Sequence, residues 1–181
     1  HLLNHDDGKT FDIIKNYITE ELGYSFHERI VKASDHGLPQ HRPRLFMVGF
    51  RNDKLSKDIP EFIFPKKDRL QMSMSDVWGG ECSREIGFTL RVGGRGSGLH
   101  DRRNWDSYFV DGEEKRLSPE EGKKMMGFPS KFHFPVSNSQ ALKQLGNSVA
   151  VNAVEATAGK VVEYLEENKH IFFENGLRKT A

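Results

Sequence analysis

Apolar residues recur at helical spacing near the start of this chain. They begin just after Thr10, a residue type that caps helices, and Gly23 follows the last of them. The pattern predicts a helix over 10–22 with an apolar face of Phe11, Ile14, Ile18 and Leu22. Residues 24–31 then alternate as a strand does, and 45–50 form a continuous apolar run typical of a fully buried strand. A helix followed by two strands predicts the trailing edge of a layered α/β domain.

The hydrophobic pattern changes after Asn52. Residues 53–113 contain Pro60, Pro65, a cluster of glycines at 93–98 and only short apolar runs. No helical period persists there, so this stretch predicts a small, irregular, mostly β module. Asp111-Gly112 predicts a hairpin turn after the apolar segment 108–110.

Helical signals return from Ser118. Ser118, Pro119 and Glu121 form a capping box with proline at the first helical position, which predicts a short helix to about Met126 that ends at Gly127. A second helix is expected from about residue 139, interrupted or ended at residue 146. A last long helix is expected to pack on the α/β domain through one face, which consists of Val151, Val154, Ala158, Val161, Val162 and Leu165.

Composition narrows the class of protein. The 181 residues, 36% hydrophobic and 29% charged, allow one good core, or one core with a small appendage. No apolar run approaches the length of a membrane-spanning helix. The single cysteine, Cys82, excludes an internal disulfide and fits a reducing cytosol, so a cytoplasmic location is expected. The chain starts at His1 rather than Met, which suggests a fragment.

Charge is concentrated locally. The net charge is only +1, but residues 84–103 carry five arginines against Glu85 and Asp101. Such a patch suits a phosphate-facing surface, and an ordinary charged loop is the alternative. The glycine-rich loop 93–98 lacks the Gly-Lys-Ser/Thr ending of a P-loop, so nucleotide binding by that loop is not expected. Arg91 and Arg95 can instead supply charge and base-edge donors near a groove.

The sequence shows no candidate metal site and no candidate nucleophile. The eight histidines include no pair at ligand spacing with a cysteine, so no metal site is expected. Cys82 has no histidine beside it that could act as a base, so its thiol is not expected to be a nucleophile.

The segment Gln40-His41-Arg42-Pro43-Arg44 concentrates polar chemistry at the start of the second predicted strand. Alternation along a strand is expected to send Arg42 and Arg44 to the same side. Their permanently charged, planar forks would hold a phosphate, a carboxylate or a carbonyl oxygen. On local chemistry alone, two surface arginines remain the alternative.

Farther along, Gly146-Asn147-Ser148-Val149 presents a carboxamide and a hydroxyl at a helix junction, where a plain helix cap is the alternative.

Three segments together resemble the DNA (cytosine-5) methyltransferase family, and they occur in the family's order. Residues 37–50 resemble its Gln-x-Arg-x-Arg motif, and residues 116–121 running on to 126–129 resemble a second motif. Residues 140–149 resemble a third. Thr89-Leu90 and the loop after it look like the family's target-recognition element. The resemblance covers most of the chain outside 51–115.

The resemblance implies roles for individual residues. Arg44 is expected to contact the carbonyl side of a flipped-out cytosine, Arg42 to share support of the active-site loop and a phosphate contact, and Gln40 to anchor the turn. Asn147 and Ser148 are the expected contacts to S-adenosylmethionine. Thr89, Arg91 and Arg95 are the expected contacts to double-stranded DNA.

The resemblance also implies what the chain lacks. The family's Pro-Cys nucleophile loop, its Glu-Asn-Val motif and its Phe-x-Gly-x-Gly cofactor loop do not occur in the sequence. The chain is therefore expected to be the C-terminal part of a restriction-modification methyltransferase, with the N-terminal catalytic part on the same or another chain, and to be inactive alone. The expected fold is α/β, with the end of a Rossmann-like catalytic domain at 1–52, a target-recognition domain at 53–115, and a hinge with returning helices at 116–181. A non-catalytic DNA-binding module and an RNA methyltransferase remain as alternatives.

Overall fold

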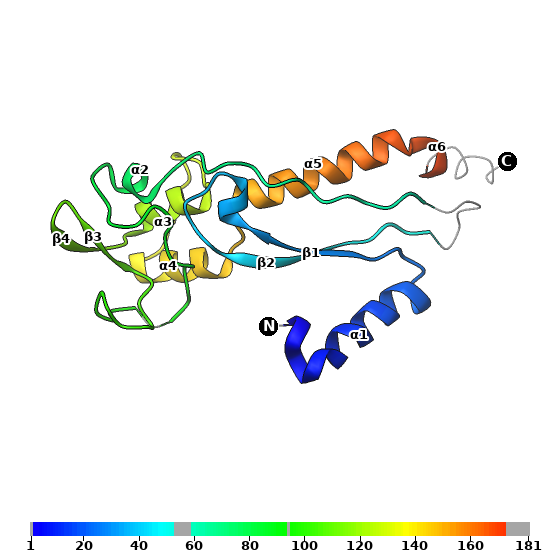
Figure 1. The fold of residues 1–181 in the computed structure, drawn as a ribbon, viewed down its shortest axis with the longest axis horizontal. Coiled ribbons are helices and arrows are strands. Elements are labelled where there is room, and N and C mark those ends of the chain that lie inside the picture. Colours follow the sequence, from blue (N-terminus) through cyan, green and yellow to red (C-terminus); the bar gives the residue numbers. More distant parts are fainter. Residues whose placement is uncertain (1, 53–58, 94, 173–181) are drawn as a thin grey trace. The chain divides into compact units, whose positions relative to one another are not determined.

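Three helices of this protein follow a serine whose side chain accepts from a backbone amide of the first turn, namely Ser73, Ser118 and Ser137. The computed structural model describes residues 2–52, 59–93 and 95–172 (Figure 1). The predicted domain start at 53 and Gly94 of the predicted loop lie outside the described residues. In chain order the elements are η1 (Leu2–Gly8), α1 (Lys9–Asn16), η2 (Tyr17–Glu21), β1 (His27–Lys32), η3 (Ala33–His36), β2 (Pro43–Val48), α2 (Met74–Trp78), β3 (Ser107–Val110), β4 (Glu113–Arg116), α3 (Pro119–Met126), α4 (Asn138–Asn147), α5 (Val151–Glu167) and α6 (Lys169–Phe172).

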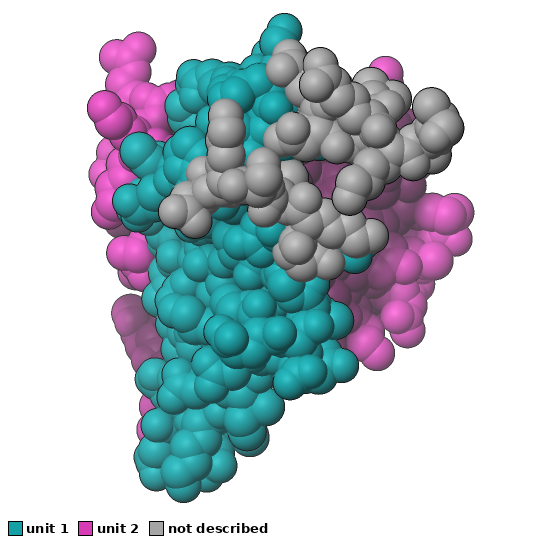
Figure 2. Space-filling model, turned by 90° about the vertical axis from the view of Figure 1, so that its right-hand side faces the viewer, with its two compact units in different colours: residues 1–30, 45–64, 159–181 teal, residues 31–44, 65–158 magenta. Residues whose placement is uncertain are grey.

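The fold is mixed α/β, and the chain divides into two compact units. Unit 1 comprises residues 1–30, 45–64 and 159–181, and unit 2 comprises 31–44 and 65–158 (Figure 2). Strands β1 and β2 pair in a two-stranded sheet, and β3 and β4 pair in a second one. No helix among the described residues is long and apolar enough to cross a membrane. The expected domain borders at 52 and 115 remain predictions.

The first helix differs from its prediction at both ends. Its N-cap is Gly8, with φ of +89°, and the hydroxyl of Thr10 is instead 2.7 Å from His5 Nδ1. The α-helix ends at Asn16 and continues as one wider turn, in which Leu22 N donates to Tyr17 O at 3.1 Å. The predicted cap was wrong because a glycine in the left-handed region turned the chain before the threonine.

The second strand is less buried than its apolar run predicted. It runs from Pro43 to Val48, and its side chains are mostly half-buried, with Met47 44% exposed. Phe50, beyond the strand, is the buried residue of the run. The prediction of a fully buried strand was wrong because β2 belongs to a sheet of only two strands among the described residues.

Unit 1 is held by aromatic rings. Phe50 stacks on Tyr164 with ring centroids 4.3 Å apart, and Phe62 meets both rings at 5.6 and 5.7 Å. The Tyr164 hydroxyl donates to Pro60 O at 2.6 Å, which satisfies the polar end of the ring. Tyr164 lies on α5, where Ala153 and Thr157 are also buried. The predicted valine face was therefore wrong, and Val162 is 55% exposed.

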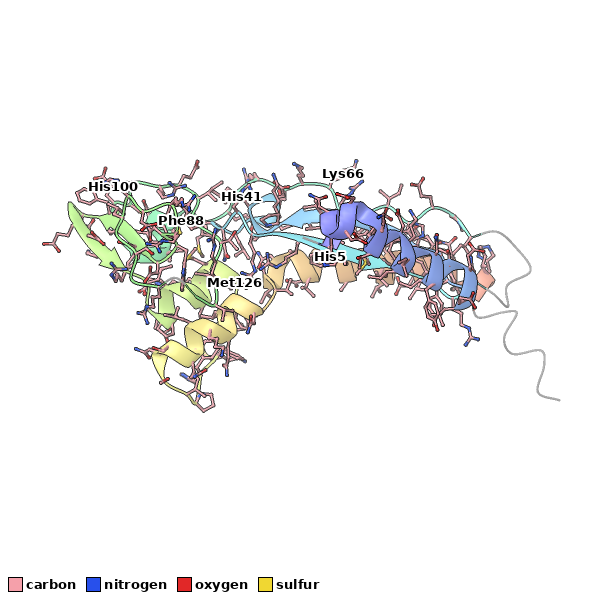
Figure 3. The ribbon with its side chains drawn as sticks, turned by 90° about the horizontal axis from the view of Figure 1, so that it is seen from below. His5, His41, Lys66, Phe88, His100 and Met126 are labelled. Carbon is pink, nitrogen blue, oxygen red and sulfur yellow. The ribbon has the colours of Figure 1, made fainter. Side chains whose placement is uncertain are left out.

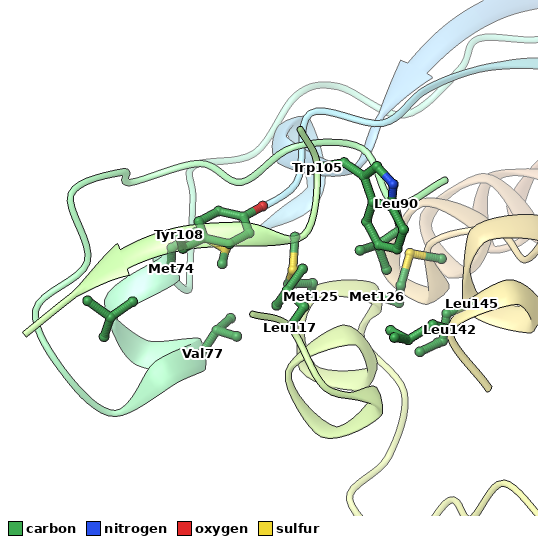
Figure 4. Close-up of a cluster of buried hydrophobic side chains, with 11 residues drawn as sticks. Met74, Val77, Leu90, Trp105, Tyr108, Leu117, Met125, Met126, Leu142 and Leu145 are labelled. Carbon is green, nitrogen blue, oxygen red and sulfur yellow. The ribbon is translucent and has the colours of Figure 1, made fainter. Parts of the chain in front are cut away.

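Unit 2 contains a closed apolar core (Figure 4). Its side chains come from α2, β3, α3, α4 and three loop residues, Leu90, Trp105 and Leu117. The full set is Met74, Val77, Leu90, Trp105, Tyr108, Val110, Leu117, Met125, Met126, Leu142 and Leu145. The hairpin is antiparallel, with Val110 opposite Glu113. Its two-residue turn has positive φ at Asp111 and Gly112, which confirms the predicted turn.

The capping box at Ser118 is confirmed. Ser118 Oγ accepts from Glu120 N at 3.2 Å, and the Glu121 carboxylate accepts from Ser118 N at 2.9 Å. Helix α3 then ends at Gly127, whose φ is +75°. Helix α4, in contrast, begins after Ser137 and passes through Gly146 to Asn147, so the glycine does not end it. These two helices carry the segments on which the candidate site depends.

Candidate functional site in unit 2

Gln40 and Arg42 lie on a stretch of chain that pairs with Gly87. Gly87 N donates to Pro39 O at 2.9 Å and His41 N donates to Gly87 O at 3.3 Å, so the two segments run parallel for one bridge. A Cβ at Gly87 would lie 2.7 Å from the Met125 methyl, so the missing side chain leaves room for Met125 beside this bridge. His41, Phe88 and Met126 mark the three segments that meet here (Figure 3).

Side chains extend this pairing beyond the backbone bridge. Arg42 N donates to Thr89 Oγ1 at 3.1 Å, and Leu90 N donates to Gln40 Oε1 at 3.1 Å. The Gln40 amide nitrogen donates to Met125 O at 3.3 Å and lies 3.1 Å from Met126 Sδ. Gln40 is 0% exposed, so each of these groups replaces a lost contact with water. The carboxamide thus ties residues 40–42 to Leu90 and to the end of α3.

The guanidinium of Arg42 is buried among backbone carbonyl groups. Nη1 donates to Leu90 O at 3.2 Å, and Nη2 donates to Gly146 O at 2.9 Å and to Ser148 O. Arg42 is 1% exposed, and its Nε has no hydrogen-bond partner among the described residues. We refer to Arg42 with these three carbonyls as the arginine clamp. The three carbonyl groups belong to residues that lie 48, 104 and 106 positions after Arg42 in the sequence.

The arginine clamp is electrostatically favourable because the guanidinium lies at the C-terminal end of helix α4. Gly146 and Ser148 lie at the end of α4, where the last carbonyls lack partners within the helix and carry its negative dipole end. A cation there is stabilising. Burial, and then repulsion from Arg44, lowers the pKa of Arg42 to about 10, so the side chain stays charged at neutral pH.

Arg42 and Arg44 do not share a side of a strand. Strand β2 begins at Pro43, and φ at Arg42 is +22°, so strand alternation does not extend back to Arg42. Arg44 is half-buried, its Nη1 donates to Pro43 O at 2.9 Å, and burial lowers its pKa. No carboxylate among the described residues pairs with it within 4.0 Å. Arg44 therefore keeps donors that a ligand can reach, whereas the one unpaired donor atom of Arg42, Nε, is buried.

The helix junction places Asn147 and Ser148 in different environments. Asn147 is exposed, and its carboxamide offers both a donor and an acceptor. Ser148 is half-buried, and its Oγ donates to Leu145 O at 2.9 Å. A Cβ at Gly146 would lie 2.8 Å from the carbonyl group of Arg91, so the backbones of α4 and of the loop after Leu90 are in contact.

The arginines of the predicted DNA-binding loop also differ from one another. Arg91 is exposed. Arg95 Nε lies 3.4 Å from Asp106 Oδ2, and its Nη2 donates to Leu117 O at 3.4 Å. Asp106 is 0% exposed and also pairs with Arg116 at 3.3 Å. Trp105 Nε1 donates to Gly93 O at 2.9 Å, and Arg116 Nη1 donates to Ser97 O at 3.2 Å, so the loop is held near both of its ends by the hairpin and the residues just before it.

The structure thus brings Gln40, Arg42, Thr89 and Ser148 together, and it places Arg44, Arg91 and Asn147 on accessible surface of the same unit. Sequence reasoning missed the acceptors of the clamp, because backbone carbonyls leave no signal in residue types. It also missed Asp106, whose position beside Trp105 gave no sign of two arginine partners. No group of three or more potential metal ligands occurs among the described residues.

Comparison with known proteins identifies the family to which these segments correspond. The family model described as C-5 cytosine-specific DNA methylase matches residues 1–90 and 83–163. The type II methyltransferase M.SsoII of Shigella sonnei is 34% identical in an alignment that covers 92% of this chain and 52% of that protein. The type II methyltransferase M.HhaI of Haemophilus parahaemolyticus is 30% identical, over 86% of this chain and 58% of its own length. The chain therefore spans somewhat over half the length of these curated relatives.

Solved structures support the same fold. The S. pombe Dnmt2 methyltransferase aligns with a TM-score of 0.59 at 15% identity, over 90% of this chain and 64% of that one. An Entamoeba histolytica methyltransferase, EhMeth, aligns with a TM-score of 0.54 at 16% identity. At such identities the likeness concerns the fold.

Proposed function

The chain belongs to the C-5 cytosine-specific DNA methylase family, and from that premise we propose that it is the C-terminal portion of a DNA (cytosine-5) methyltransferase. The whole enzyme would transfer a methyl group from S-adenosylmethionine to C5 of cytosine in a short duplex site, as part of a bacterial restriction-modification system. The N-terminal catalytic part would lie on the same chain or on a second one, completing a Rossmann-like domain.

The observation that carries this proposal is the arginine clamp. Three segments that resemble family motifs, at 40–44, 89–91 and 146–148, are far apart in sequence and meet through the side chains of Gln40 and Arg42 in one unit. Beside the clamp, a second arginine, Arg44, is half-exposed and has donors to spare. The geometry supports a surface on which Arg44 can contact a ligand.

Each accessible residue has a role that its chemistry suits. We assign Arg44 to the carbonyl side of the extruded cytosine, because a guanidinium presents two parallel donors to oxygen. Gln40 and Arg42 hold the segment before Arg44 in place through their buried hydrogen bonds. Thr89, Arg91 and Arg95 are assigned to the duplex, with Arg91 the most accessible of the three.

Asn147 and Ser148 suit the cofactor. A carboxamide with donor and acceptor and a hydroxyl with free lone pairs can bind the polar groups of S-adenosylmethionine. When bound, S-adenosylmethionine supplies the methyl group. Asn147 is exposed at the end of α4, and the carbonyls on both sides of it are held by Arg42, so its backbone is fixed before a ligand arrives.

The nucleophile of the reaction is assigned to the N-terminal part. The chemistry implied by the family requires a cysteine that attacks C6 and an acidic residue at N3 of the cytosine. Cys82 does not fit that role, because it lies beside the β3–β4 hairpin, where it bridges to Val110, and its amide donates to Ser75 Oγ at 3.0 Å. What this chain contributes is positioning of the base, the duplex and the cofactor.

The test is a methyl-transfer assay with labelled S-adenosylmethionine and cytosine-containing duplex DNA. The chain alone is expected to transfer no methyl group, and a fusion to the N-terminal half of M.SsoII is expected to methylate cytosine. Arg44→Ala in that fusion should abolish transfer, while the exposed loop variant Lys131→Ala serves as the matched control and should retain it. Transfer by the chain alone would contradict the division of the active site.

A non-catalytic DNA-binding module is the second candidate. The closed core and the arginine loop of unit 2 favour it, because they form one compact unit. A fusion that binds duplex DNA as tightly as the chain does, yet transfers no methyl group while the complete M.SsoII does, would decide for this module.

A further inference from the structure

Arg42 joins two segments to which different ligands are assigned. Leu90 lies between Thr89 and Arg91, which we assign to DNA, and Gly146 and Ser148 flank Asn147, which we assign to the cofactor. We propose that Arg42 is a positioning residue that couples these two segments and that it contacts neither phosphate nor base. The identity of the two ligands rests on the proposed function, but the coupling itself does not.

Both Nη groups of Arg42 already have acceptors, and its unpaired Nε is buried. Both Nη atoms donate to carbonyl oxygens inside unit 2, and the side chain is 1% exposed. A phosphate could recruit this guanidinium only by leaving the carbonyls of Leu90, Gly146 and Ser148 buried without a donor. Each such loss costs roughly 1–3 kcal/mol. Arg44, one residue beyond Pro43, offers free donors without that cost.

The contact between the two segments leaves little room for one to move alone. The Gly146 position backs directly onto the Arg91 carbonyl group, with no side chain between them to absorb a displacement. Arg42 then holds both backbones from the same guanidinium. Closely packed backbone is not continuously deformable, so the recognition loop and the end of α4 should shift together or not at all.

A coupling between ligands follows from this shared rigidity. A cofactor that orders Asn147 also orders Leu90 through the clamp, and a duplex then meets a loop whose ordering cost has been reduced. The reverse holds by reciprocity. Arg42 would therefore set how strongly cofactor and DNA favour each other, although it touches neither.

The first test is hydrogen exchange of the 181-residue chain, without any ligand. Arg42→Met is expected to speed amide exchange about fivefold or more in residues 88–92 and also in 145–149. The hairpin 107–116, which the clamp does not contact, should be accelerated only by the fall in global stability and therefore less than either clamped segment. The matched control Arg44→Met should change none of the three segments. Faster exchange in only one of the two clamped segments, or equally in the hairpin, would overturn the coupling.

A milder variant covers the case in which Arg42→Met does not fold. Thr89→Val keeps the shape of the side chain and removes the acceptor of Arg42 N. It is expected to speed exchange in 88–92 and, through Arg42, in 145–149. A change confined to 88–92 would argue against transmission.

The second test separates positioning from phosphate contact. Duplex binding is measured by fluorescence anisotropy over a series of salt concentrations. Arg42→Met is expected to weaken binding about tenfold with no change in the slope of log K against log salt. Arg91→Met should reduce the magnitude of that slope by about 0.9, the value for one phosphate contact.

The outcomes of this second test remain distinguishable. A slope reduced by about 0.9 in Arg42→Met would make Arg42 a phosphate ligand and overturn the proposal. A wild-type chain that binds no duplex would contradict the proposed function instead, and the exchange measurement would then decide the coupling alone.

Discussion

The segment 40–42, in which Gln40 and Arg42 are buried, and the largely exposed loop that begins at Arg91 both depend on arginine, yet they use it in opposite ways. Arg42 has three carbonyl partners on two other segments and almost no exposed surface, whereas Arg91 is exposed. Arg95 stands between them, partly exposed and paired with the buried Asp106. The difference teaches that an arginine motif does not report its own role. The backbone around it decides whether the fork holds the protein or a ligand.

The largest expected effect is a loss of stability when Arg42 is replaced. If this loss did not occur, the contrast between a buried structural arginine and an exposed one would not hold. Arg42→Met leaves three buried carbonyls without a donor, so we expect the free energy of unfolding to fall by about 3–5 kcal/mol. Urea denaturation followed by tryptophan fluorescence reports this, since Trp78 and Trp105 both lie in unit 2. The control Arg44→Met should stay within about 0.5 kcal/mol of the wild type. Equal losses in the two variants would remove the distinction between them.

A smaller effect is expected where the two backbones touch. Gly146→Ala would place a Cβ 2.8 Å from the Arg91 carbonyl group, and we expect a loss of about 1–3 kcal/mol from the forced displacement. The matched control Gly159→Ala lies on α5, where a Cβ meets nothing within 4 Å, and should gain up to about 1 kcal/mol of helix propensity. Thermal unfolding followed by circular dichroism compares them. A stabilised Gly146→Ala would mean that the loop does not pack on α4.

Thr89→Val sharpens the comparison on the side of the loop. The substitution removes the acceptor for Arg42 N while it keeps the volume of the side chain. We expect a loss of about 1 kcal/mol in the free energy of unfolding, since one partly buried hydrogen bond is broken. Thr157→Val is the control, because its hydroxyl bonds only to Ala153 within α5 and its loss should cost less. The two urea midpoints, measured in parallel, give the difference.

The smallest expected effect is of pH, and it should come from outside the clamp. Burial lowers the pKa of His27 in unit 1 and of His36 in unit 2 from 6.5. The unfolded chain therefore binds more protons than the folded chain just below pH 6.5, and stability falls as the pH drops through that value. We expect this loss to be smaller than the effects of the substitutions above.

Substitution of the two histidines assigns this effect. His27→Gln and His36→Gln together should flatten the loss of stability between neutral pH and about pH 5.5, measured by urea denaturation. Arg42→Lys should leave the pH dependence as it is, because the clamp keeps its charge in this range. An acid-dependent loss that persists in the double variant would place the titrating group elsewhere.

Local signals in the sequence predicted local structure well. The capping box at Ser118 and the hairpin turn at Asp111 each depend on residues within four positions of one another, and both are confirmed. The cap at Thr10 was wrong, because Gly8 offered a left-handed turn two residues earlier. The buried valine face was also wrong. Periodicity marks apolar positions on a helix, but what covers them is decided by the rest of the fold.

The site was predictable in its residues and not in its geometry. The motif at 40–44 and the junction at 146–148 were visible in the sequence, and the structure joins them. What joins them is an arginine bonded to carbonyl oxygens, and a carbonyl has the same chemistry in every residue type. The split of roles between Arg42 and Arg44 also depends on a positive φ at a residue that is not glycine, and strand alternation predicts no such value.

The most direct test of the arginine clamp is side-chain NMR of the guanidinium groups in the wild-type chain. We predict that the Nη hydrogens of Arg42 exchange slowly with water and rotate slowly about the Nε–Cζ bond, with couplings across hydrogen bonds to the carbonyl carbons of Leu90 and Gly146. The corresponding signals of Arg44 should show fast exchange. An Arg42 guanidinium that exchanges and rotates as fast as that of Arg44 would contradict the account.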